Sequence, residues 1–288
     1  MHKRASGFTL VELILVIVIL GIVGLGIAGF VRSATSAYLD MTEREALLRD
    51  GSFFVERLTR ELSDAVPNSV RLTGNASAHC LEFVPINWNT YYLDIPLVDE
   101  SGATVDLIEM SNDLQGQVYV PDANDVAIVY PLRAEHVYGV PNPDNADDIR
   151  MRPILSCDDD DNDCSTATDA DSIVQLSLGD GFFTDSPSKR IYIADQAISY
   201  CVRSNAVYRH VSNISGAQSL YTSGGVLMAE NINNILSADP SISPGDQDPF
   251  RIFDSSLRRN AYTQLRFILS REDEQISFIK EVHTPNVP

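Results

Sequence analysis

The sequence is poor in basic residues, cysteine and tryptophan. Its 288 residues include 21 Lys and Arg against 40 Asp and Glu, which gives a formal net charge of −19. This balance argues against a nucleic-acid binder, because phosphate neutralisation needs clustered Lys and Arg. Hydrophobic residues make up 44% and charged residues 21% of the chain, which is ordinary globular composition and excludes wholesale disorder.

Recognisable catalytic motifs are also missing. The chain has no nucleophile elbow, no P-loop, no HExxH zinc motif and no Cys-x-x-Cys. Neighbouring carboxylates such as Asp99-Glu100 and Asp147-Asp148 could support acid–base chemistry, but such pairs are common on solvated surfaces. The sequence therefore predicts a protein that is not an enzyme.

One long apolar run is present near the start. Residues 8–31 read FTLVELILVIVILGIVGLGIAGFV and contain one charge, Glu12. At about 1.5 Å per residue, a helix of this length spans the roughly 30 Å hydrocarbon core of a bilayer. Lys3 and Arg4 precede the run, so the positive-inside rule places the N-terminus in the cytoplasm and the rest of the chain outside.

Two simpler explanations of this run are a cleavable signal peptide ending at Ala28 and a plain membrane anchor. The run exceeds the 7–15 apolar residues of a signal-peptide core. A carboxylate within it costs a few kcal/mol unless it is neutralised or reaches the cytoplasmic interface. Glu12 is therefore the feature that these simpler explanations leave without a role.

The helical pattern continues beyond the apolar run. No proline occurs before Pro67, and Gly51 is the only glycine between residues 32 and 65. Apolar residues recur mostly three, four or seven positions apart, at Tyr38, Met41, Leu48, Val55, Leu58, Leu62 and Val66. We predict one helix of nearly sixty residues, with residues 8–31 in the membrane and amphipathic residues 32–66 packed on a soluble head.

The start of the chain resembles the type III signal of type IV pilins and pseudopilins. The resemblance rests on a basic leader ending in Gly7, followed by Phe8-Thr9-Leu10-Val11-Glu12 and an apolar helix. It implies that residues 1–7 are a leader, that prepilin peptidase cuts between Gly7 and Phe8, and that Phe8 is then methylated. It also implies that Glu12 meets the N-terminal amine during subunit docking, which supplies the cation that a carboxylate in hydrocarbon needs.

After Val66 the sequence period changes from 3.6 to 2, which predicts a β-rich head over residues 67–288 with no internal repeat and no dividing linker. The predicted strands are residues 80–86, 117–120, 126–130, 173–178, 197–203, 206–211, 261–269 and 275–282. Two hairpins are predicted, with turns at 203–205 and 270–274. The predicted fold class is α+β, a long N-terminal helix packed on a mainly antiparallel sheet head.

The four cysteines predict two disulfides in an exported head. Proximity favours Cys157 with Cys164, which leaves Cys80 with Cys201, although three connectivities are open. Between Cys157 and residue 171, four oxygen-bearing residues fall at positions 1, 3, 5 and 12 of a calcium-loop count, namely Asp158, Asp160, Asn162 and Asp169. The loop lacks the usual glycine and glutamate, so a solvated acidic loop without metal is the alternative.

Short segments of the head are similar to the larger minor pilins, closest to the MshO family of the mannose-sensitive haemagglutinin (MSHA) pilus. They are RLTRELSDAVPNSVRL, HCLEFVPI, ISYCVRSNAVYRH and the strand before VHTPNVP. The resemblance implies a subunit of the inner membrane and later of the pilus, whose partners are other minor and major pilins, prepilin peptidase and the inner-membrane assembly platform. The alternatives are a J-type pseudopilin of type II secretion and a signal-anchored periplasmic binding protein.

Overall fold

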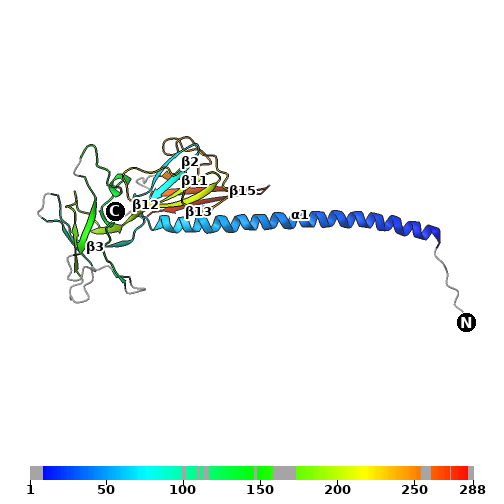
Figure 1. Cartoon of the computed structure of the whole chain (residues 1–288), viewed down its shortest axis with the longest axis horizontal. Helices are drawn as coiled ribbons and strands as arrows, with labels where there is room; N and C mark the ends of the chain where they lie inside the picture. The colour runs from blue at the N-terminus through cyan, green and yellow to red at the C-terminus, as the bar shows by residue number, and fades with distance from the viewer. Residues whose placement is uncertain are drawn as a thin grey trace.

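A long helix leaves a β-rich head, and the first half of the helix stands clear of it (Figure 1). The predicted α+β class with a largely antiparallel head is confirmed. The computed structural model describes residues 9–98, 102–108, 111–112, 117–145, 148–157, 173–253, 261–272 and 274–284.

Helix α1 (Leu10–Ser63) is one uninterrupted rod of 54 residues. Its N-cap is Thr9, whose Oγ1 accepts a hydrogen bond from the backbone N–H of Glu12 at 3.3 Å. Its C-cap is Asp64, so the helix ends a few residues before Pro67. The rod therefore stops slightly earlier than the sequence pattern predicted.

The part of α1 that packs on the head is also shorter than the predicted residues 32–66. Buried positions begin only at Leu47. Tyr38 and Met41, which belong to the predicted apolar stripe, are 69% and 73% exposed. Helical periodicity identifies an apolar face, but it carries no signal for the point at which a head begins to cover that face.

Two antiparallel sheets hold the end of α1 between them. The first has the order β1 (Arg71–Asn75), β2 (Ala78–Phe83), β11 (Gln196–Arg203), β12 (Ala206–Asn213) and β13 (Val226–Ala229). The second has the order β14 (Phe250–Phe253), β15 (Tyr262–Arg271) and β16 (Glu274–His283). We call these sheets, together with residues 47–63 of α1, the base.

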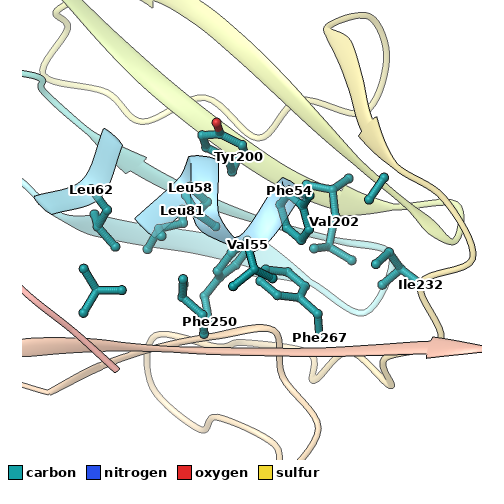
Figure 2. Packing of buried hydrophobic residues seen from close by; sticks show 14 of the residues in the cluster. Phe54, Val55, Leu58, Leu62, Leu81, Tyr200, Val202, Ile232, Phe250 and Phe267 are labelled. Carbon is teal, nitrogen blue, oxygen red and sulfur yellow. The ribbon is translucent and has the colours of Figure 1, made fainter. Parts of the chain in front are cut away.

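The core of the base is filled by the helix itself. Phe54 and Leu58 of α1 are fully buried. Figure 2 shows them between Tyr200 of the first sheet and Phe267 of the second. The ring centroids of Phe54 and Phe267 lie 4.5 Å apart in an edge-on contact. The base is therefore a three-layer sandwich in which the rod is the middle layer.

A closed antiparallel barrel of six strands is inserted between β2 and β11. Its cyclic order is β10 (Arg190–Ala194), β3 (Trp88–Asp94), β4 (Thr104–Ile108), β9 (Ile173–Leu178), β8 (Met151–Cys157) and β7 (Val126–Val129). A hairpin of β5 (Ser111–Asn112) and β6 (Gln117–Val118) and the short helix α2 (Ala134–Val137) complete the insertion. We call residues 87–195 the barrel segment; its strand β3 lies at the end of the head away from the N-terminus (Figure 1).

A small cluster of side chains joins the barrel segment to the base. Tyr138, fully buried beside α2, donates a hydrogen bond from its hydroxyl to the carbonyl of Ser69 at 2.9 Å. The guanidinium of Arg71 lies 3.4 Å from the centroid of the Tyr138 ring and also binds the buried carboxylate of Glu82. Ser199 donates to the other oxygen of Glu82 at 2.9 Å. A satisfied polar group therefore lies at the junction.

Both predicted hairpins are present, and a disulfide lies beside the first. In the hairpin of β11 and β12, Arg203 pairs with Ala206, so the turn is two residues with positive φ, as a type I′ turn requires. Cys201 of β11 lies directly opposite Cys80 of β2 and is bonded to it. Cys157 is also disulfide-bonded, while Cys164 lies outside the described residues.

Candidate assembly interface

The exposed half of α1 is the candidate interface, because it carries the longest run of exposed apolar side chains among the described residues. The structure describes this surface from Leu10 onward, and every side chain from there to Val31 is exposed. The helix is long and apolar enough to cross a membrane, near the N-terminus. The predicted processing residues Gly7 and Phe8 lie outside the described residues.

Glu12 is the one charge on this surface. It occupies the third helical position, and Thr9-x-x-Glu12 has the spacing of a capping box. Its side chain is exposed and has no hydrogen bond or ion pair within the described part of the chain, while its backbone N–H donates to Oγ1 of Thr9. In a helix that crosses a membrane, a carboxylate at this position needs a cation from outside these residues or contact with water.

Four glycines lie in the same exposed half of α1, where no described part of the chain packs against them. A Cβ built on Gly21, Gly24, Gly26 or Gly29 would meet nothing within 4 Å. Glycines in apolar helices let a neighbouring helix approach closely. The spare space at these positions is therefore available to another helix.

Gly51, in contrast, is used within the chain. A Cβ at this position would lie 2.3 Å from Cε2 of Phe278 on β16, so any larger residue would have to displace the Phe278 ring. Gly51 is the only glycine of the amphipathic half, and the sequence alone predicts no role for it. Its isolation in an otherwise glycine-free helical stretch was the available signal.

A charged cluster fixes the orientation of the rod against the first sheet. Glu61 of α1 accepts hydrogen bonds from Nε of Arg209 at 2.9 Å and from the hydroxyl of Tyr200 at 3.0 Å. Arg57, one turn earlier, donates to the second oxygen of Glu61 at 3.0 Å. Burial, followed by the negative charge of Glu61, raises the pKa of Tyr200, so its hydroxyl stays protonated and remains a donor.

Two buried histidines, His136 and His210, have fixed surroundings. His136 of α2 contacts Asp148, which also pairs with Arg150 at 2.7 Å. Burial and then the charge of Arg150 lower the pKa of His136, so its ring is neutral at pH 7. His210 of β12 stacks on Tyr221 with ring centroids 4.0 Å apart. Each ring packs against its neighbours, and neither faces a Ser or Cys nucleophile among its described partners.

The four predicted calcium ligands, Asp158, Asp160, Asn162 and Asp169, lie outside the described residues. Among the residues that are described, no three His, Cys, Asp or Glu side chains gather into a group that could hold a metal ion. Calcium binding by the 157–171 loop therefore stays a prediction.

Comparison with known proteins finds a match for the N-terminal signal but none for the head. The family model of the prokaryotic N-terminal methylation motif matches residues 2–28, which include Gly7, Phe8 and Glu12. No curated protein and no solved structure matches the chain significantly. The motif and the exposed apolar helix together fit membrane anchoring and support a type IV pilin-like or pseudopilin protein.

Proposed function

We propose that this chain is a minor type IV pilin that takes part in initiating or assembling an MSHA-like pilus. The observation that carries the proposal is the continuity of the rod. A methylation motif over residues 2–28 runs directly into one helix of 54 residues, which is bare at its start and held by the head at its end. Such a chain can leave a membrane and pack in a filament without refolding.

In this proposal the bare half of α1 performs the assembly. Prepilin peptidase cuts between Gly7 and Phe8 and methylates the new amine. Glu12 then pairs with the N-terminal amine of a neighbouring subunit, which neutralises the carboxylate inside the apolar filament core. Close helix contact at the unused glycines strengthens the same packing. The work is non-enzymatic, and the partners are other minor and major pilins and the assembly platform of the inner membrane.

The second candidate is a J-type pseudopilin of type II secretion, because the same signal and rod serve both machines. A signal-anchored periplasmic binding protein is the third candidate, and it would leave Glu12 and the spare glycines unused. A clean deletion scored for surface pili and for secreted hydrolases separates the first two. We expect pili to be lost and secretion to be normal. Blocked secretion with normal pili would instead indicate that the chain is a pseudopilin of type II secretion.

Mass spectrometry of the N-terminus tests the processing step on which both filament roles depend. We expect a mature chain that begins at methylated Phe8. An intact Met1 or a cut after Ala28 would contradict both roles. As a matched pair, Glu12→Gln should be processed normally yet fail to restore pili in the deletion strain, while Glu45→Gln, at an exposed position of α1 beyond the apolar half, should restore them.

A further inference from the structure

The negative charge of the molecule is concentrated in the barrel segment. Residues 87–195 hold 22 Asp and Glu against 5 Lys and Arg, a net charge of −17. The other 179 residues hold 18 acidic and 16 basic side chains, a net charge of only −2. The rod and the base are therefore nearly neutral, and almost the whole of the charge of −19 belongs to one inserted segment.

The barrel segment is a true insertion in the topology. Strands β2 and β11 pair with each other directly, from Ala78 with Arg203 to Phe83 with Ile198. The chain leaves the base into β3 and returns from β10, and these two strands are themselves paired. The backbone N–H of Asn87 donates to the carbonyl of Ile193 at 2.9 Å at this root. The first sheet of the base therefore needs no strand from the barrel segment.

The five cations of the barrel segment are already engaged within it. Arg133 and Arg150 bind Asp148 at 3.2 and 2.7 Å. Arg152 pairs with Asp180, Lys189 with Asp185, and Arg190 donates to the hydroxyl of Tyr91. Exposed carboxylates such as those of Asp94, Asp122 and Asp144 have no cation of the described residues against them. Among the described residues, these carboxylates therefore face solvent without a compensating cation, and the segment's cations are already used.

We propose that the barrel segment prevents two copies of this subunit from standing side by side. The inference rests on the proposed function, in which parallel helices pack against one another. Parallel rods offset by about one helical turn, so that Glu12 meets the amine of the neighbour, place the barrels of adjacent copies side by side, at the end of the head away from the N-terminus (Figure 1). Like charges brought within the Debye length of about 8 Å repel, and such juxtaposition disfavours the wrong partner at an interface.

This repulsion selects neighbours of a different kind. A subunit with a neutral or basic head meets no such penalty, because repulsion needs negative charge on both partners, and the base and rod of this chain are themselves nearly neutral. The subunit can therefore be incorporated next to another pilin but not next to itself. Low copy number then follows from the head and needs no separate control.

Association of the full chain in lipid vesicles tests the proposal without a filament. Donor and acceptor fluorophores on a C-terminal tag report self-association by energy transfer. The test variant neutralises four exposed carboxylates of the barrel segment by Asp→Asn at Asp94, Asp122, Asp144 and Asp180. The matched control neutralises four exposed carboxylates of the base, by Glu→Gln at Glu230, Glu272 and Glu281 and Asp246→Asn. Asp180 and Asp246 each have one Arg partner, so the two sets are alike in charge and in pairing.

We expect the barrel variant to self-associate about three- to fivefold more strongly than the wild type, because repulsion scales with the product of the two charges. The base variant should change less, and 0.5 M salt should bring the wild type towards the barrel variant. Equal association of the two variants, or no response to salt, would overturn the proposal. The vesicle measurements do not depend on pilus formation. Failure of the proposed function is instead detected by the deletion strain, through its pili and its secretion.

Discussion

The base and the barrel segment reach a closed core in opposite ways. The base is complete only with α1, because Phe54 and Leu58 of the rod lie between its two sheets. The barrel closes on its own strands, and its core, around Leu107 and Phe182, contains residues of the barrel segment alone. Force on the rod is therefore carried directly into the base, whereas the barrel contacts the base through a separate buried cluster that includes Val84 and Tyr192.

The largest effect should come from removing the helix side chain at the centre of the base. Phe54→Ala leaves a cavity between Tyr200 and Phe267, and we expect the free energy of unfolding of the base to fall by about 3–5 kcal/mol. The barrel should be unaffected. Trp88, the only tryptophan, packs against Tyr119 in the barrel, so its fluorescence reports the barrel while helical circular dichroism reports the base.

The reciprocal change is Phe182→Ala, which removes a fully buried ring from the barrel core. It should lower the denaturant midpoint seen by Trp88 and leave the midpoint seen by circular dichroism in place. Both variants are measured as the full chain in detergent. If either substitution moved both midpoints equally, the base and the barrel would be one cooperative unit and the comparison would fail.

The sequence carried more information about the base than about the barrel. The strands of both base hairpins were predicted within about two residues, because β12, β15 and β16 alternate or carry β-branched residues beside clear turns. Strand β10 was missed, since it is only five residues long and buried at four of them, which leaves no period to detect. It is also the strand that closes the barrel, by pairing with β3 and β7 far away in sequence.

The candidate interface divides in the same way. Gly7, Phe8 and Glu12 were predicted from local sequence, because a peptidase signal is linear. The contacts that hold the rod were not found, because Gly51 with Phe278 and Glu61 with Arg209 are each separated by more than a hundred residues. The local sequence pattern predicts which helices and strands form, whereas contacts between residues far apart in the sequence decide how those elements pack.

A smaller effect should follow from Gly51→Ala, which tests the contact between α1 and β16. Alanine favours a helix by up to about 1 kcal/mol over glycine, but its Cβ must displace the ring of Phe278. We expect the base to lose about 1–3 kcal/mol by circular dichroism, with Trp88 unchanged. Gly51→Ala combined with Phe278→Leu should recover part of the loss, and Ser52→Ala, on the exposed side of the same turn, is the control. A stabilised single variant would mean that the ring moves aside freely.

The smallest effect should be a dependence on pH carried by His210 of the base. Burial, and then the charge of Arg203, lower the pKa of His210, so the folded base favours the neutral ring. Below the ordinary histidine pKa of about 6.5 the unfolded chain takes up a proton that the folded base resists, so the stabilisation present above that pH is lost as the pH falls towards the lowered value. His210→Phe preserves an aromatic ring against Tyr221 and should flatten the dependence of the circular dichroism midpoint between pH 7.5 and 5.5. His136, whose pKa is also lowered, lies in the barrel segment. The dependence of the Trp88 midpoint should therefore survive in His210→Phe, and its loss would show that protonation is shared across the junction.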